Sequence, residues 1–492
     1  MYRSRTNDNL QDDVLKFLSS VAQDQSLLHY DILGSEAHSI MLHEMGHITD
    51  EQLREILAAL EEAKKNPIKL HEKQYEDIHE GLEAFVLERA GIEAGGKMHL
   101  ARSRNDQVVL DTRMKIRDDI NEICSALARL LEGIVERATE YIQIPMPMYT
   151  HLQQAQIGTF SHFLSSYAYG LVRDMERLYL VYHRINQSPL GACAIGGSSI
   201  SIDRKRTASL LGFDSTVRNS IDATSSRDAF LEYTSTLAIL TTTLARIAED
   251  FIIWSTSEFG YIELADSYSS TSSAMPQKKN PDPLELTRAK AAIVASNLVA
   301  MFSIVKALPS GYSRDLQDIK PPLLEASNLA LETIKIVDGV IRSLKVNKER
   351  MIQAASSSYA ISLDIAEQLV MHKNIPFRTA HRIVGALVGK AVTKGNIPLA
   401  KLGISDAASA INELKVDVKP DELIKIISEM TPKKSLNARK SSGSPNPVEQ
   451  EDMLKTLSRS AASYRVGIQK RTEAVENSFY NLQKTVKSHI GS

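Results

Sequence analysis

The chain predicts an all-α fold built around a central bundle of long helices, and two observations support this prediction. Proline is absent between residues 67 and 145, 189 and 276, and 322 and 376, so helices can run through these stretches without interruption. Apolar residues recur there at alternating spacings of three and four, which is typical of long helices that pack nearly parallel. The series are Phe230, Tyr233, Leu237, Leu240, Leu244, Ile247, Phe251 and Trp254; Ile116, Ile120, Ile123, Leu127, Leu130 and Ile134; and Ala330, Ile334, Val337, Ile341 and Leu344.

The chain divides into three predicted domains. Residues 1–102 form an N-terminal domain of shorter helices, and residues 103–355 form the central domain of long helices. Residues 356–492 form a small C-terminal helical domain and tail, with a loop rich in Ser, Pro and basic residues at 433–450. The most apolar stretch, 291–305, is shorter than the roughly 20 apolar residues of a membrane span, so we expect a buried helix there.

Composition argues against several classes of protein. The 58 Lys and Arg residues are balanced by 60 Asp and Glu residues, which removes the general electrostatic case for nucleic acid or an anionic membrane as a partner. Only two cysteines are present, Cys124 and Cys193, so neither a disulfide framework nor a cysteine metal site is indicated. The polar N-terminal residues do not resemble a signal peptide. We therefore predict a soluble, cytoplasmic protein.

A His-Glu-x-x-His signature of zinc proteases stands at 43–47. Zinc binding by this motif requires one continuous helix and a third ligand. Gly46 lies inside the motif, and Thr49 and Gln52 after it have the spacing of a capping box, which starts a new helix. We therefore predict a junction between two helices and no metal site.

The glycine-rich stretch Gly191–Ser198 resembles a phosphate-binding loop of nucleotide-binding proteins. Gly197, however, occupies the place of the lysine that must reach the phosphates. A glycine-rich turn is the favoured interpretation, and no nucleotide cofactor is predicted.

The stretch Thr271–Leu286, TSSAMPQKKNPDPLEL, has the composition of an anion-binding loop between two helical patterns. Asn280 followed by Pro281 has the sequence of an N-cap and a first helical position. Free backbone N–H groups at such a helix start favour anions, and Lys278 and Lys279 add positive charge. A substrate carboxylate is the candidate ligand, and a solvated loop is the alternative.

Two further segments place polar residues at expected helix starts. Gly95–Gln107 gathers basic and amide side chains just before a long helix, and Tyr149–Gln156 places His151 after two prolines, where we expect a helix to begin. Taken alone, the first segment is interpreted as a helix cap with surface charges. The lone histidine of the second is interpreted as structural.

Three motifs together resemble the fumarase/aspartase superfamily and, within it, the argininosuccinate lyase family. They are ARSRNDQ at 101–107, THLQ at 150–153 and SSAMPQKKNP at 272–281. The resemblance covers most of the chain and implies a three-domain, all-α homotetramer with a twenty-helix core, in which three subunits contribute to each active site. It also implies reversible cleavage of argininosuccinate to arginine and fumarate, a step of arginine biosynthesis, without a metal or cofactor.

The resemblance implies catalytic roles for four residues. Ser272 takes the Cβ proton and His151 protonates the leaving guanidino nitrogen, although the superfamily assigns these two roles in either order. Lys278 holds the carboxylate whose negative charge grows during the elimination. Glu285 orients His151 and raises its basicity.

The resemblance also implies a set of substrate contacts. Arg3 or Arg5 is the candidate for a further contact that family members make with an N-terminal lysine. The other contacts are Ser20, Asn105, Thr150, Asn280, Tyr312, Gln317 and Lys320. This set of hydroxyl, amide and ammonium donors suits a substrate with several carboxylates and a guanidinium group.

Two other functions fit the same fold. Another fumarate-releasing lyase, such as adenylosuccinate lyase, would use the same chemistry, but ARSRNDQ and the QKKN core of the third motif argue against it. A catalytically silent structural relative, as lens δ-crystallins are, would not be expected to retain all four predicted catalytic residues.

Overall fold

The apolar residues that recur every three or four positions form the buried stripes of the long helices. The predicted series on α10 (Asp228–Trp254) is buried from Phe230 to Trp254. The series along α6 (Arg104–Thr139) and α12 (Lys320–Ser343) lie in the same core. The prediction of a mostly helical chain with a central bundle of long helices is therefore confirmed.

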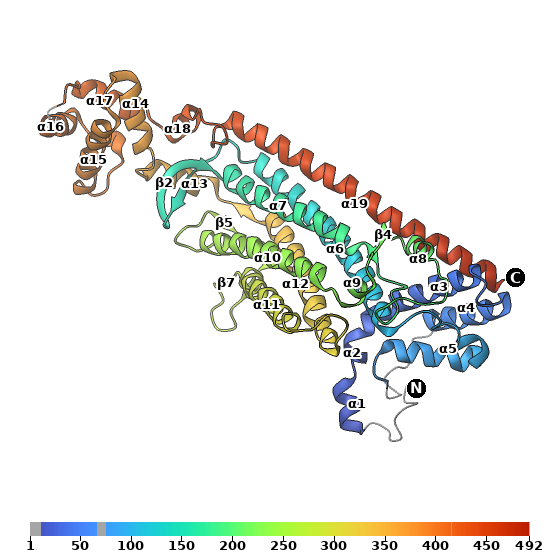
Figure 1. Cartoon of the computed structure of the whole chain (residues 1–492). Coiled ribbons are helices and arrows are strands. Elements are labelled where there is room, and N and C mark those ends of the chain that lie inside the picture. Colours follow the sequence, from blue (N-terminus) through green and yellow to red (C-terminus); the bar gives the residue numbers. More distant parts are fainter. Residues whose placement is uncertain (1–10, 66–74, 415, 492) are drawn as a thin grey trace.

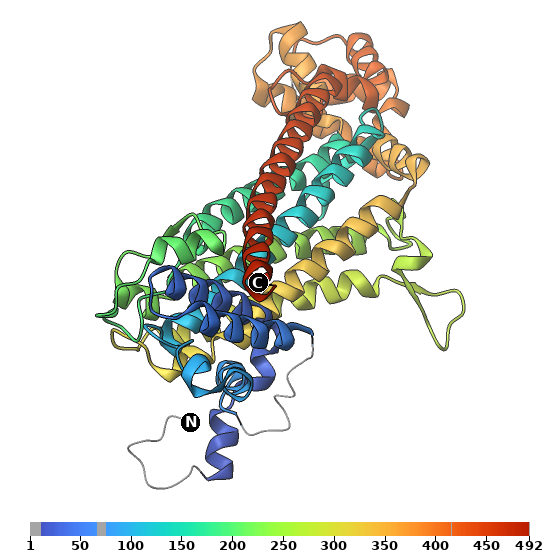
Figure 2. The same ribbon diagram turned by 90° about the vertical axis from the view of Figure 1, so that its right-hand side faces the viewer.

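The long helices lie side by side along an elongated molecule (Figure 1). The structure, a computed structural model, describes residues 11–65, 75–414 and 416–491, so Arg3 and Arg5 lie outside the described residues. The last helix, α19 (Pro447–Ile490), runs along the bundle from the C-terminal lobe to the N-terminal region (Figures 1 and 2). The other bundle helices are α7 (Phe160–Ile185) and α11 (Asp282–Val305).

One helix of the bundle, α11, is largely exposed in the single chain. It is long and apolar enough to cross a membrane, by length and composition alone. In this structure only 17% of its most apolar window is buried. Val299 and Phe302 on this helix are 64% and 49% exposed. The expectation of a buried helix at 291–305 is therefore wrong for the single chain, because hydropathy does not say whether the covering surface belongs to the same chain.

Shorter helices pack against one end of the bundle and form a second apolar core. Leu482 and Val486 from the last turns of α19 are part of this core, so the end of the chain is fixed against the N-terminal region. The shorter helices that precede or interrupt the bundle are α1 (Asp12–Leu18), α2 (Val21–Asp24), η1 (Gln25–Leu27), α3 (Leu28–Glu44), α4 (Asp50–Lys65), α5 (Ile78–Gly95), α8 (Arg204–Leu210) and α9 (Ser220–Ser225).

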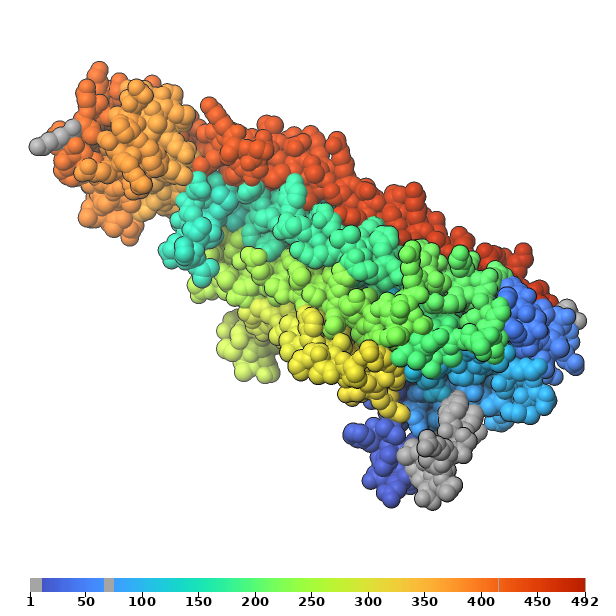
Figure 3. Space-filling model, viewed as in Figure 1, coloured from blue at the N-terminus to red at the C-terminus, as the bar shows by residue number. Residues whose placement is uncertain are grey.

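The C-terminal lobe stands at the other end of the molecule (Figure 3) and has its own apolar core. The basic segment 433–450, expected as a loop, begins instead as a short helix, in which Ser435 Oγ donates to Asp364 Oδ2 at 2.8 Å. Just after this helix, Arg439 forms an ion pair with Asp364 at 2.8 Å. The helices are α13 (Lys348–Ser357), α14 (Ser362–Lys373), α15 (Phe377–Thr393), η4 (Leu399–Lys401), α16 (Ile404–Leu414), α17 (Pro420–Glu429) and α18 (Pro432–Ala438).

Strands occur only as short pairs in the part of the chain that the structure describes. The antiparallel pairs are β1 (Pro145–Thr150) with β2 (Gln153–Thr159), β5 (Ile262–Glu263) with β8 (Lys345–Val346), and β6 (Ser270–Thr271) with β7 (Lys279–Asn280), while β3 (Gln187–Ser188) and β4 (Ser215–Thr216) are parallel. Two 3₁₀ turns, η2 (Asp266–Tyr268) and η3 (Arg314–Gln317), precede β6 and α12.

The segment that resembles a zinc-protease motif is the predicted junction between two helices. The first helix, α3, ends at Glu44, Gly46 follows with a positive φ of 77°, and α4 begins at Asp50. Thr49 and Gln52 form the reciprocal capping box: each backbone N–H donates to the other's side-chain oxygen, at 3.1 and 3.2 Å.

The two histidines of the motif have separate partners. His43 Nε2 lies 2.8 Å from Asp50 Oδ1, whereas His47 Nε2 lies 2.6 Å from the carbonyl oxygen of Ser201. Because His47 lies beyond the end of α3, the two imidazoles do not share the helix face that the zinc motif requires.

Candidate active site

The predicted residues Thr150 and His151 lie at the tip of the β1–β2 hairpin. The strands are joined by the two-residue loop His151–Leu152, in which both residues have positive φ, 53° and 56°. A two-residue hairpin turn of type I′ requires positive φ at both positions, which Asn and Gly usually supply. Here two residues with larger side chains adopt it, and the His151 imidazole is held at an exposed apex.

The expectation that a helix begins at His151 is wrong. Pro145 and Pro147 lie in β1 instead, a strand with a single neighbour, which tolerates residues without an N–H group. The helix begins only at Phe160, where Thr159 Oγ1 caps it by accepting from the backbone N–H of His162 at 2.9 Å.

Ser272, Lys278 and Asn280 lie on a second exposed segment. The pairing of β6 with β7 closes this loop, which projects from the side of the bundle (Figure 2). Ser272 Oγ accepts from the backbone N–H groups of Ala274 at 3.3 Å and Met275 at 3.1 Å. Donors aimed at this oxygen favour negative charge on it, which is the property a serine base needs.

The start of α11 differs from the predicted one by one residue. Pro281 is the N-cap and the helix begins at Asp282, while Asn280 is held in an extended conformation by its pairing in β7. The predictions of Asn280 as the N-cap and Pro281 as the first helical residue are therefore wrong. Glu285 lies exposed in the first turn of the helix.

A pocket of about 350 Å³ in the N-terminal region gathers most of the predicted substrate contacts. Five of these contacts line it together, although they lie far apart in the sequence: Ser20, Asn105, Tyr312, Gln317 and Lys320. The other residues that line it are Glu76, Asp77, His99, Ser103, Arg104, Val108 and Arg314.

Asp24 joins two of these contacts. Ser20 Oγ donates to Asp24 Oδ2 at 2.6 Å, and Lys320 Nζ lies 2.5 Å from Asp24 Oδ1. Asp24 is fully buried and Lys320 is 3% exposed, and charges this deeply buried are tolerated only when paired. Asp24 therefore fixes both the ammonium and the hydroxyl group. Sequence reasoning missed Asp24, although its spacing of four from Ser20 is that of facing residues on a helix.

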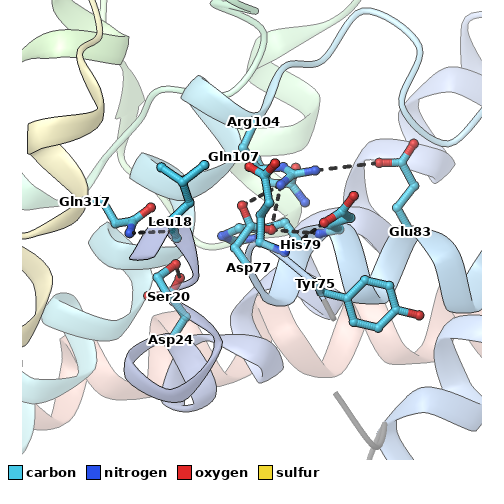
Figure 4. A network of polar contacts seen from close by, with 12 residues as sticks. Leu18, Ser20, Asp24, Tyr75, Asp77, His79, Glu83, Arg104, Gln107 and Gln317 are labelled. Carbon is cyan, nitrogen blue, oxygen red and sulfur yellow. Dashed lines mark hydrogen bonds and ion pairs between the residues drawn. The ribbon is translucent and has the colours of Figure 1, made fainter. Parts of the chain in front are cut away.

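Two ion pairs form another wall of the pocket. Arg104 Nη1 donates to Asp77 Oδ1 at 2.6 Å, and Arg314 Nη1 donates to Glu76 Oε2 at 3.0 Å (the Arg104 pair is drawn in Figure 4). Burial alone would raise the pKa of Asp77, but His79 and Arg104 hold it below its usual value. Sequence reasoning did not identify these ion pairs; the only signal was the place of Arg104 within ARSRNDQ.

A buried polar cluster lies behind the pocket. His79 Nδ1 lies 2.9 Å from Asp31 Oδ2 and 3.5 Å from Asp111 Oδ2, and Gln107 Nε2 donates to Asp31 Oδ1 at 2.5 Å. Burial, together with the Asp31 charge, raises the pKa of Asp111 well above its usual range. Burial alone would also raise the pKa of Asp31, but His79 and Arg102 hold this pKa below its usual value. The spacing of these groups would fit a metal ion, but the neighbouring Arg102 charge favours a network of ion pairs.

The three groups of predicted residues lie far apart in one chain. The β1–β2 hairpin lies beside the C-terminal lobe and the β6–β7 loop projects from the bundle, whereas α2, whose N-cap Ser20 lines the pocket, lies near the opposite end (Figure 1). One chain therefore holds the candidates for proton transfer and the pocket that gathers the predicted substrate contacts in separate places.

Known proteins match the chain along its whole length. A family model described as a lyase matches residues 6–295, and one described as the argininosuccinate lyase C-terminal region matches residues 359–428. The chain is 48% identical over 490 residues to an argininosuccinate lyase of Nitrosopumilus maritimus, with 100% of both chains covered. It is 39% identical over 477 residues to that of Methanocaldococcus jannaschii, with 96% of each covered.

Solved structures agree with the fold. EDDS lyase in complex with formate has a TM-score of 0.88 at 30% identity, covering 97% of this chain and 94% of that one. A class II fumarase from Schistosoma mansoni has a TM-score of 0.69 at 17% identity, covering 83% and 90% of the two chains, which supports the fold alone. The matches along the full length, together with the helical bundle and the gathered pocket, show that the chain belongs to the argininosuccinate lyase family of the fumarase/aspartase superfamily.

Proposed function

We propose that the chain is a carbon–nitrogen lyase that reversibly cleaves argininosuccinate to arginine and fumarate in arginine biosynthesis. The observation that carries this proposal is the pocket that gathers the expected substrate contacts in a chain 48% identical to an argininosuccinate lyase. Lys320, Arg104 and Arg314 offer positive charge to carboxylates, while Asp77 and Glu76 offer negative charge to a guanidinium or ammonium group. A substrate that carries both kinds of charge suits this lining.

The elimination requires a base that removes a proton next to a carboxylate. Ser272 takes this Cβ proton, and the two backbone N–H groups on its oxygen favour the alkoxide that does so. Negative charge then grows on the adjacent carboxylate, where Lys278 and the loop amides stabilise the transition state more than the ground state.

The departing nitrogen requires a proton donor on the opposite side of the reacting bond. His151, held at the apex of the hairpin, protonates the guanidino nitrogen as the carbon–nitrogen bond breaks. Glu285 accepts a hydrogen bond from the imidazole and so keeps it oriented and basic enough to recover its proton. Thr150 and Asn280 contact the substrate from the same two segments.

The separation of these segments in one chain supports a homotetramer in which three subunits contribute to each active site. Exposed apolar residues on α11, among them Leu286, Val299 and Phe302, would be covered by helices of other copies in a shared core. The two free cysteines, Cys124 and Cys193, suit a reducing, cytoplasmic location.

A panel of substrates tests the proposed reaction. Purified protein, treated with a chelator, is incubated separately with argininosuccinate, adenylosuccinate and malate, and fumarate is followed by ultraviolet absorbance. Fumarate is expected from argininosuccinate alone. Fumarate from another member of the panel would reassign the substrate, and no fumarate from any of them would indicate a silent relative.

Mixed oligomers test whether the sites are shared. Ser272→Ala and Lys320→Met, each inactive alone, are expected to regain activity when the two variants are co-expressed, because some mixed sites then receive both native segments. The specific activity of the purified mixture is measured against each single variant.

Two variants of the same loop provide the matched control. Ser272→Ala co-expressed with Lys278→Met should show no recovery, because both changes damage the same segment wherever it is inserted. Equal activity in the two mixtures would contradict the sharing of sites between subunits.

A further inference from the structure

The glycine-rich loop Gly191–Ser198 lies against two walls of the substrate pocket. Asn105 Nδ2 donates to the carbonyl oxygen of Ala194 at 2.9 Å. On the other side, Ile195 packs against Gly311: a Cβ added to Gly311 would lie 3.0 Å from Cδ1 of Ile195. Gly311 directly precedes Tyr312. The loop therefore contacts the side chain of Asn105 and the residue before Tyr312, and Asn105 and Tyr312 are both predicted substrate contacts.

A single buried carboxylate fastens this loop to the start of α6. Asp106 Oδ2 accepts from the backbone N–H groups of Gly191 at 2.9 Å and Cys193 at 2.8 Å, while its Oδ1 accepts from the N–H of Ser103 at 2.9 Å. Asp106 is fully buried. Its hydrogen bonds therefore join the ARSRNDQ segment to the loop.

The surroundings keep Asp106 charged at neutral pH. Burial raises the pKa of Asp106 to about 6, and the backbone N–H groups and Arg102 oppose a larger rise. Arg204 is the other cation that faces it, and Arg204 Nε also donates to the carbonyl oxygen of Leu190 at 2.8 Å. An ionised carboxylate makes stronger hydrogen bonds to N–H groups than a neutral acceptor does.

The loop needs such a fastening because its backbone is unfavourable. Cys193 has a φ of 55°, and Gly191 has a φ of 87° with Arg204 and Ile202 packed where a Cβ would lie. A residue other than glycine in the left-handed region costs of order 1 kcal/mol or more, and persists where the surrounding contacts over-determine it. The hydrogen bonds from Gly191 and Cys193 to Asp106 supply such contacts and hold both residues in this conformation.

We propose that Asp106 is a positioning residue, which holds the loop Gly191–Ser198 against the walls of the substrate pocket and thereby sets the places of Asn105 and Tyr312. This proposal rests on the proposed cleavage of argininosuccinate. Asp106 itself touches no substrate in this scheme and acts through Asn105 and the loop.

Replacing Asp106 with Asn keeps the size of the side chain but puts an NH₂ group where one acceptor oxygen faces backbone N–H donors. We expect KM for argininosuccinate to rise about tenfold, from the loss of at least one hydrogen bond to a charged group, while kcat stays within about threefold. Asp364→Asn is the matched control, because Asp364 is also buried and hydrogen-bonded but lies in the C-terminal lobe. It should leave KM unchanged, since loss of folded protein lowers the apparent kcat and not the affinity.

Cys193 provides a readout that does not depend on activity. Of the two cysteines, Cys124 is fully buried and Cys193 is partly exposed, so a thiol reagent such as DTNB reports on the loop. We expect Asp106→Asn to raise the rate of labelling at Cys193 about tenfold, because the hydrogen bonds that hold the loop are weaker in this variant. Asp364→Asn should leave the labelling rate unchanged. Cys193→Ser in the wild-type background identifies the labelled site by removing the signal.

The outcomes separate this proposal from the proposed function. A folded Asp106→Asn enzyme with unchanged KM and unchanged labelling would overturn the positioning role. If the chain did not cleave argininosuccinate at all, the labelling rate would still decide whether Asp106 holds the loop. If Asp106→Asn failed to fold, Gly191→Ala, which forces the loop away from Arg204, should raise KM in the same way, and an unchanged KM there would overturn the proposal.

Discussion

Ser272→Ala is expected to lower kcat for argininosuccinate by about 10²- to 10⁴-fold and to change KM little. Proton transfer by a positioned side chain contributes a factor of this size, and the Ser272 hydroxyl lies on an exposed loop where its removal leaves no buried polar group unpaired. The initial rate of fumarate formation, followed over a range of argininosuccinate concentrations, separates kcat from KM.

The neighbouring serine is the control for this experiment. Ser273→Ala removes a hydroxyl from the same exposed loop and is expected to keep kcat within about twofold, since a surface substitution away from a bonded group has a small effect. A Ser272→Ala enzyme with wild-type kcat would show that Ser272 is not the base. A large loss of kcat in His151→Asn would then assign that role to the imidazole.

The helical bundle was predictable because its cause is local. The series that runs from Phe230 to Trp254 buries every one of its apolar positions on α10, and a spacing of three and four residues places them on one face of a helix wherever that helix packs. The helix junction after Glu44 was predictable for the same reason: Gly46, Thr49 and Gln52 act on their own backbone.

The hairpin at His151 and the exposure of α11 were not predictable from the same signals. Pro145 is compatible with a helix start and with an edge strand, and the choice is made by pairing with β2. For α11, the sequence correctly predicts an apolar helix, but Val299 and Phe302 are exposed in the single chain. Apolar composition alone does not determine whether the rest of the chain packs over a helix, just as Pro145 alone does not determine whether a strand forms.

The candidate site divides in the same way. The family resemblance predicted Ser20, Asn105 and Lys320, which line one pocket, but it did not predict the supporting carboxylates Asp24 and Asp106. Supporting groups act through partners distant in the chain, as Asp24 does with Lys320 and Asp106 with Gly191. A sequence alone does not state which of many charged residues form such pairs.

Asp24→Asn is expected to lower the free energy of unfolding by about 3–5 kcal/mol, the usual cost of removing one partner from a buried ion pair. The side chains of Lys320 and Asp24 are 4% and 0% exposed, so the ammonium would be left charged, desolvated and unpaired. The same change frees the Ser20 hydroxyl, which donates to Asp24. Because both side chains line the pocket, KM for argininosuccinate should rise more than about tenfold, the effect of losing one to two charge-assisted bonds. Denaturant unfolding and fumarate release measure the two effects.

A second variant separates stability from binding. The double change Asp24→Asn with Lys320→Met removes both charges and should recover much of the lost stability, because a buried ion pair can often be replaced by apolar groups at little cost. Activity should not recover with the stability, since the ammonium group is then missing from the pocket. Glu122→Gln, which breaks an exposed pair with Lys335 (57% and 58% exposed), should change stability by less than about 1 kcal/mol. If Asp24→Asn were no more destabilising than Glu122→Gln, Asp24 would not be the group that holds Lys320 in place. If the double variant recovered activity along with stability, the Lys320 ammonium would have no part in binding the substrate.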